Sequence, residues 1–212
     1  MAVRADPIAE AAAAARRGGL IVFPTDTVYG LGSTPGDPVA IERIFRAKRR
    51  PSDLALALLV SSVLDARTVA ALDDRAERLA AECWPGALTL VLPRAEASVA
   101  WDLGGDRDTV AVRMPHHPLA LALLAASGPL AVTSANRSGL PPATTCDELT
   151  AAFGDDVDCY LCQDDPLRGL ASTVLDLAHD PPAILRAGAV DREALARFLG
   201  SKEPLLDSPI SP

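Results

Sequence analysis

The sequence has no long apolar run and little positive charge. No stretch of its 212 residues approaches the roughly 18 uncharged residues that a membrane span needs. Arg4, Asp6 and Glu10 stand where a signal peptide would be apolar. The net charge of −8 and the pI of about 4.8 argue against a protein that binds mainly by coating nucleic acid phosphates. We therefore expect a soluble cytoplasmic protein with no membrane partner.

Cysteine and histidine are scarce. A chain of this length, 49% hydrophobic, does not need disulfides to stabilise a small core. Cys159 and Cys162 fall in the strand-like stretch VDCYLCQ, where a three-residue spacing puts two side chains on opposite faces. We interpret them as small buried apolar residues rather than zinc ligands or a redox pair. The three histidines fall outside every polar cluster, and we expect no metal site made of protein ligands alone.

Helical and strand patterns alternate along the chain, which predicts the α/β class with a mixed sheet. Helices are expected over residues 7–17, 38–47, 73–83, 118–126, 148–153 and 192–199, and strands over residues 20–23, 54–60, 87–93, 109–115, 130–136, 157–162, 172–177 and 183–188. One domain is expected over residues 1–200. Residues 201–212, SKEPLLDSPISP, have little to bury and are expected to form a flexible tail.

The stretch PTDTVYGLG follows the apolar run LIVF, which has the length and branched content of a buried strand. Pro24 ends the ladder of that strand, so the polar residues lie at a strand end, where ligands bind in open α/β sheets. Gly30 and Gly32 allow either a close backbone approach or a positive φ. An ordinary turn from strand to helix is the alternative.

The polar clusters at element ends contain mainly hydroxyls and cations. No histidine lies in any of them, so a hydrolase triad has no base, and Asp26 is the one plausible carboxylate for a glycosidase pair. The P-loop and GxGxxG patterns are absent. The cations and hydroxyls in these clusters suit a site for a polyanionic ligand, because both kinds of group donate hydrogen bonds to anionic oxygens. The cations are Lys48, Arg50, Arg113 and Arg186.

Each cluster also has a simpler interpretation. Lys48 and Arg50 could form a solvated helix end that complements the helix dipole. Ser134 and Asn136 could belong to a turn or a helix N-cap. Arg113 differs, because it ends an alternating apolar strand at a point where a charge needs a partner.

In chain order, the motifs resemble those of the YrdC family, whose best-known activity is threonylcarbamoyl-AMP synthase. The motifs are PTDTVYGLG, K-x-R-P, WPGALTLVLPR, TVAVRMP-x-HP, SANRSG-x-P and STV-x-D…ILR-x-G, spread from about Gly18 to Gly188. The resemblance implies a twisted sheet around a large concave cavity. It also implies a nucleotidyltransferase that joins L-threonine, bicarbonate and ATP into threonylcarbamoyl-AMP and pyrophosphate. The product would serve a partner transferase that makes threonylcarbamoyladenosine in tRNA.

The resemblance also assigns roles to residues. Lys48 and Arg50 would be catalytic and, with Thr109, Ser134, Asn136, Thr144 and Arg186, would bind ATP. Thr25, Arg113 and Ser172 would bind threonine and bicarbonate, with Arg113 gripping the carboxylate. Mg²⁺ would enter with the phosphates and water rather than in a protein cage. A threonine carbamate is already an anionic nucleophile, so the absence of a catalytic histidine agrees with this chemistry.

The chain departs from the family pattern at a few positions. Leu54, Ala55 and Leu59 occupy positions where an Asn-Pro-Leu run and a histidine are common, and Ala171 replaces the acid of G-V-E-S-T. Two alternatives stay open. One is a YrdC-like paralogue that binds RNA or a nucleotide without making the adenylate, and the other is a carbamoyl-transfer module of a larger maturation enzyme.

Overall fold

A computed structural model of the chain describes residues 6–49, 54–167, 169–200 and 204–208. Its helices are α1 (Pro7–Arg16), α2 (Pro38–Lys48), α3 (Val63–Val69), α4 (Asp74–Cys83), α5 (Pro118–Ser127), α6 (Cys146–Phe153) and α7 (Arg192–Leu199), with short 3₁₀ turns at Glu96–Ser98 and Gly154–Asp156. Its strands are β1 (Ile21–Phe23), β2 (Gly30–Ser33), β3 (Ala57–Leu59), β4 (Leu88–Pro93), β5 (Thr109–Arg113), β6 (Leu130–Ser134), β7 (Cys159–Tyr160), β8 (Thr173–Asp176), β9 (Ala183–Arg186) and β10 (Leu206–Asp207).

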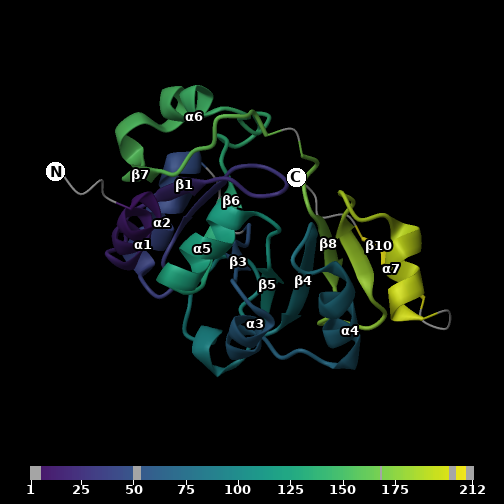
Figure 1. The fold of residues 1–212 in the computed structure, drawn as a ribbon. Helices are drawn as coiled ribbons and strands as arrows, with labels where there is room; N and C mark the ends of the chain where they lie inside the picture. The colour runs from purple at the N-terminus through teal and green to yellow at the C-terminus, as the bar shows by residue number, and fades with distance from the viewer. Residues whose placement is uncertain (1–5, 50–53, 168, 201–203, 209–212) are drawn as a thin grey trace.

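The described strands form one mixed sheet in the order β10-β9-β8-β4-β5-β3-β6-β2-β1-β7 (Figure 1). The β3–β5 and β4–β8 pairs are parallel, whereas β4–β5 and β3–β6 are antiparallel. This confirms the predicted α/β class with a mixed sheet. Among the described residues, no helix combines the length and apolar character that crossing a bilayer requires.

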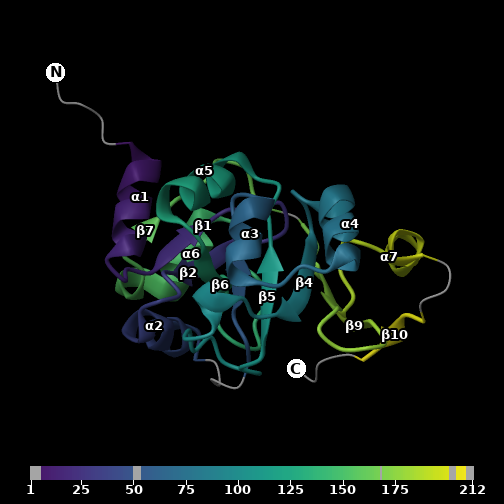
Figure 2. The same ribbon diagram turned by 90° about the horizontal axis from the view of Figure 1, so that it is seen from below.

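The central strands alternate between two environments. Leu88, Leu90 and Leu92 of β4 belong to the main core together with Val110 and Val112 of β5. Residues from α3 and α4 lie in the same cluster, and Figure 2 shows these two helices in front of the central strands. The side chains between them in sequence, Thr89, Val91, Thr109, Ala111 and Arg113, therefore point to the other face of the sheet.

Strand β2 was not predicted, because its sequence GLGS lacks branched residues and resembles a turn. A Cβ at Gly30 would lie 2.8 Å from Cγ1 of Val132, and one at Gly32 would lie 2.7 Å from Cγ2 of the same residue. The two glycines thus allow β2 to pair closely with β6. Of the two roles predicted for these glycines, the close backbone approach is confirmed and the positive φ is not.

Helix α3 was also missed. Ser62 caps it by accepting a hydrogen bond from the Asp65 N–H.

Two expectations from the sequence are wrong: that the cysteines form no disulfide, and that the whole C-terminal segment is a flexible tail. A disulfide joins Cys146, the first residue of α6, to Cys162, with a Cα–Cα distance of 5.8 Å. Strand β7 ends at Tyr160, so Cys162 lies beyond it and the alternation of side chains along a strand does not apply to this pair.

In the C-terminal tail, Leu206 and Asp207 form β10 beside β9, and Leu205 is buried. The flexible-tail expectation therefore fails for residues 205–207; residues 201–203 and 209–212 lie outside the described residues.

Candidate active site

A cavity of about 630 Å³ lies against the face of the sheet that α3 and α4 leave uncovered. Its floor is formed by alternate residues of β4 and β5, among them Thr89, Val91, Thr109, Ala111 and Arg113. Six of the predicted site residues line it: Thr25, Thr109, Arg113, Ser134, Ser172 and Arg186. The sheet therefore gathers residues that are far apart in sequence, from Thr25 to Arg186.

Residues 24–29 contribute one wall of the cavity through Thr25, Thr27 and Val28. The two threonine hydroxyls are 3.0 Å apart, and Thr25 Oγ1 donates to the Val28 carbonyl oxygen at 2.6 Å. Thr25 Oγ1 also accepts from the backbone N–H groups of Thr27 and Val28, both at 3.2 Å. The hydroxyl of Thr25 thus stabilises the turn, although the residue lines the cavity as predicted.

Arg113 is almost completely buried and has the charge partner that its position required. Its Nη2 donates to Asp26 Oδ1 at 2.6 Å, its Nη1 to Thr27 Oγ1 at 2.8 Å and its Nε to the Gly86 carbonyl oxygen at 2.9 Å. Burial lowers the pKa of Arg113, and the nearby Asp26 opposes that shift. An arginine stays protonated in proteins, and the three hydrogen bonds hold this guanidinium in one orientation.

Arg186 also faces the cavity but has no carboxylate partner among the described residues. Its Nε donates to the Ser172 carbonyl oxygen at 3.1 Å and its Nη2 to Ser172 Oγ at 2.9 Å. Ser172 Oγ lies 2.9 Å from Thr89 Oγ1. Desolvation lowers the pKa of Arg186. A partly desolvated cation without a counter-charge favours an anionic ligand at this end of the cavity.

Lys48 ends α2 and lies under the segment that follows β6. Its ammonium donates to the backbone oxygens of Ser134 at 2.6 Å and Asn136 at 2.7 Å, and to Asn136 Oδ1 at 3.1 Å. Ser134 Oγ donates to the same Oδ1 at 2.6 Å. Lys48 is only 2% exposed, so it is not a solvated helix-end charge. The structure brings Lys48 and the S-x-N segment together, with Ser134 on the cavity wall.

The remaining predicted residues lie further from the cavity or outside the description. Asn136 and Thr144 do not line the cavity; Thr144 donates to Glu148 from its backbone N–H at 2.7 Å. That bond is the main cause of a lowered pKa of Glu148. Arg50 lies outside the described residues.

Asp176 and His179 are two of the cavity residues that the sequence interpretation did not identify. Asp176 ends β8, and its Oδ2 lies 2.8 Å from Nδ1 of His179; both residues line the cavity. The hydrogen bond to Asp176 raises the pKa of His179. The motif STV-x-D contained the signal for Asp176, whereas nothing near His179 in the sequence indicated that its turn closes onto the cavity.

Comparison with known proteins agrees with this fold. The sequence model of the Sua5/YciO/YrdC family, described as "Telomere recombination", matches residues 13–188. The chain therefore belongs to the Sua5/YciO/YrdC family.

Particular relatives give the same picture. A threonylcarbamoyl-AMP synthase of Pyrococcus abyssi is 42% identical over 87% of this chain and 55% of its own length. A putative threonylcarbamoyl-AMP synthase of Mycobacterium tuberculosis (strain H37Rv) is 40% identical over 93% of this chain and 91% of its own length. The crystal structure of P. abyssi Sua5 complexed with L-threonine has a TM-score of 0.87 and 40% identity, covering 96% of this chain and 60% of that one. The chain thus spans just over half of the Pyrococcus protein.

Proposed function

We propose that this protein is a threonylcarbamoyl-AMP synthase. It would convert L-threonine, bicarbonate and ATP into threonylcarbamoyl-AMP, pyrophosphate and water. The observation that carries the proposal is that one cavity brings cations and hydroxyls together. These residues are Arg113, Arg186, Ser172, Thr109 and Ser134. The names of the relatives support it, including a Sua5 structure that holds L-threonine.

The cavity suits the chemistry of this reaction. The amine of threonine combines with bicarbonate to form a carbamate, and a carbamate oxygen then attacks the α-phosphate of ATP while pyrophosphate leaves. The carbamate is already anionic, so the reaction depends on positioning and on neutralising negative charge. In this scheme Arg113 holds the threonine carboxylate. Arg186 and the segment organised by Lys48 contact the phosphates.

Magnesium would belong to the nucleotide substrate rather than to the protein. Among the described residues, no group of three or more His, Cys, Asp or Glu side chains could hold a metal ion. We propose that Mg²⁺ arrives on the ATP phosphates and keeps water molecules as its other ligands.

The product is a mixed anhydride that water would hydrolyse, so it needs a prompt acceptor. We propose that a partner transferase takes the threonylcarbamoyl group and attaches it to tRNA, and that tRNA therefore meets this protein only indirectly. The site of action would be the cytoplasm, which holds ATP and tRNA.

The decisive measurement is pyrophosphate release from ATP, with threonine and bicarbonate each omitted in turn. The proposal expects release only when both are present, together with a threonylcarbamoyl-AMP mass in the products. Nucleotide binding with no release of pyrophosphate would instead identify a YrdC-like paralogue that binds RNA or nucleotide without synthesis.

A further inference from the structure

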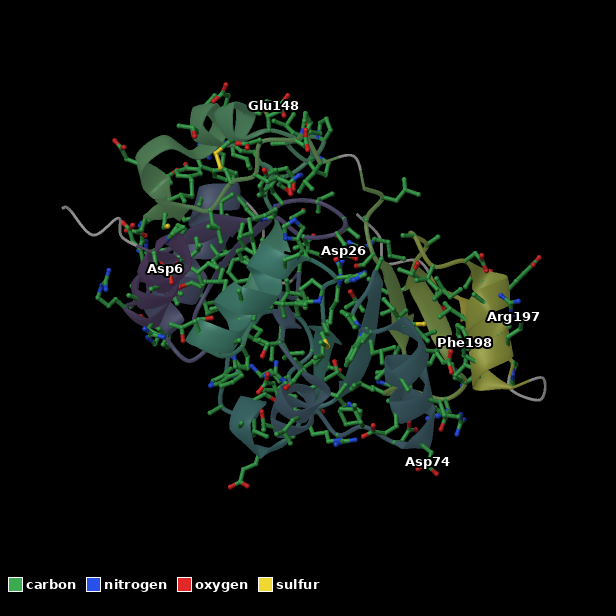
Figure 3. All side chains as sticks on the ribbon, viewed as in Figure 1. Asp6, Asp26, Asp74, Glu148, Arg197 and Phe198 are labelled. Atoms are coloured by element: carbon green, nitrogen blue, oxygen red, sulfur yellow. A yellow bond between two sulfur atoms is a disulfide. The ribbon has the colours of Figure 1, made fainter. Side chains whose placement is uncertain are left out.

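We propose that Asp26 is a positioning residue for Arg113, and that it acts with Thr27 to hold the guanidinium ready for the carboxylate of the amino acid. This inference rests on the proposed function, because it concerns how the same site recognises its amino acid substrate. Figure 3 shows Asp26 near the middle of the molecule.

The guanidinium of Arg113 is fixed at all three of its nitrogen atoms. Asp26, Thr27 and the Gly86 carbonyl oxygen accept one hydrogen bond each, from Nη2, Nη1 and Nε respectively. A guanidinium has five N–H groups, so one N–H remains on each terminal nitrogen. These two N–H groups are the donors left for the oxygens of a substrate carboxylate.

Asp26 is itself anchored on a second element. The Oδ1 atom that accepts from Arg113 also accepts from the backbone N–H of His116 at 2.9 Å. The side chains of Asp26 and Arg113 are only 18% and 7% exposed. Asp26 thus joins the wall formed by residues 24–29 to the segment after β5, and it is held in place by more than the ion pair.

The threonines fix the direction of the adjoining hydrogen bonds. Thr25 has one hydroxyl proton, which it donates to the Val28 carbonyl oxygen at 2.6 Å. In the 3.0 Å contact between the hydroxyls, Thr27 must therefore donate to Thr25. Thr27 Oγ1 then acts as an acceptor toward Arg113 Nη1. The chain Arg113 to Thr27 to Thr25 to Val28 has a single polarity, which stabilises one orientation of the guanidinium.

Asp26 could instead compete with the substrate carboxylate for Arg113, and the two roles predict opposite signs. Removing the aspartate adds net positive charge to the cavity, so competition and general electrostatics both predict tighter threonine binding. Positioning predicts weaker binding, because Arg113 loses its orientation. The anchoring by His116 favours positioning, since Asp26 is not free to move aside.

The test is titration calorimetry of L-threonine with the full chain, comparing wild type with Asp26→Ala, Asp26→Asn and Thr27→Val. We expect the Kd for L-threonine to rise roughly ten- to hundredfold in Asp26→Ala, a range typical of misplaced binding groups. Asp26→Asn keeps one acceptor oxygen, so its Kd should lie between those of wild type and Asp26→Ala. Thr27→Val keeps the side-chain volume and removes the Nη1 acceptor, so its Kd should also rise.

Two controls separate positioning from a general loss of structure. Glu77→Gln changes an exposed carboxylate that pairs with Arg67 away from the cavity, and it should leave the Kd unchanged. In the pyrophosphate assay, the Asp26 variants should raise KM for threonine far more than KM for ATP. If Asp26→Ala does not fold, Asp26→Asn and Thr27→Val carry the test.

The outcomes are distinct. Wild type that fails to bind L-threonine overturns the proposed function and this inference with it. Wild type that binds, with Asp26 variants that bind equally well or more tightly, overturns only the positioning role. An equal rise in both KM values would also contradict it.

Discussion

The ammonium group of Lys48 lies 2.7 Å from the backbone oxygen of Asn136 and 3.1 Å from its side-chain oxygen. Eighty-eight residues separate the two in sequence. Because the same ammonium also holds the Ser134 carbonyl oxygen, Lys48 fixes the turn that places the Ser134 side chain on the cavity wall. A lysine that is buried and satisfied in this way organises the site in addition to supplying charge.

We expect Lys48→Met to reduce adenylate formation at least about a hundredfold, since losing a preorganised donor near developing charge costs roughly 3–4 kcal/mol. The free energy of unfolding should also fall, because the partly buried backbone oxygens of Ser134 and Asn136 lose the donor that Lys48 supplies. The rate of pyrophosphate release and urea unfolding measure the two effects. Arg46→Met, on the exposed side of the same helix, is the control and should cost under about 1 kcal/mol in either assay. Turnover near that of wild type in Lys48→Met would show that the lysine has no role in catalysis.

The Cys146–Cys162 disulfide closes a loop over a sequence separation of 16 residues. A cross-link of that length stabilises a fold by about 3 kcal/mol in the chain-entropy view. We expect reductant to lower the free energy of unfolding of the wild type by roughly this amount, and to have no effect on Cys146→Ser/Cys162→Ser. Cys159→Ser, which changes a free cysteine, should keep the response to reductant. Identical urea curves for wild type with and without reductant would contradict the prediction.

The C-terminal segment should contribute to stability. Leu205 is 8% exposed and packs in the main core with Leu195 and Leu199, while Arg192 contacts the Leu205 carbonyl oxygen and Asp207. We expect Leu205→Ala to lower the free energy of unfolding by about 2 kcal/mol, the lower end of the range for buried leucines. The matched control is Leu206→Ala, because Leu206 is 44% exposed and should cost under about 0.5 kcal/mol. Equal urea midpoints for the two variants would mean that the segment adds nothing to the core.

Local patterns predicted the parts of the site that depend on local structure. The alternation in TVAVR placed Thr109 and Arg113 on one face of β5, and the charge at the end of that strand indicated that Arg113 needs a partner. The identity of the partner was not predictable, because Asp26 is 87 residues away and only the folding of residues 24–29 over the sheet brings it near.

The elements that were missed depend on tertiary contacts. Strand β2 exists because Gly30 and Gly32 let it approach Val132 closely, and a glycine-rich sequence gives no periodic signal. Strand β10 is two residues long and forms only because β9 offers a free edge. The disulfide likewise depends on the turn after β7, which no spacing rule describes.

Threonine should be preferred over serine, but only modestly. Arg113 can bind the carboxylate of any amino acid, so discrimination must come from contacts with the side chain. The two substrates differ by one methyl group, and the cavity offers apolar contacts from Leu54, Leu59 and neighbouring residues. One methyl in an apolar pocket is worth about 1–3 kcal/mol, which corresponds to roughly ten- to two-hundredfold in kcat/KM. The measurement is kcat/KM for each amino acid, followed by pyrophosphate release. Equal values would show that the apolar wall does not contact the substrate side chain, and release that needs no amino acid would contradict the synthase itself.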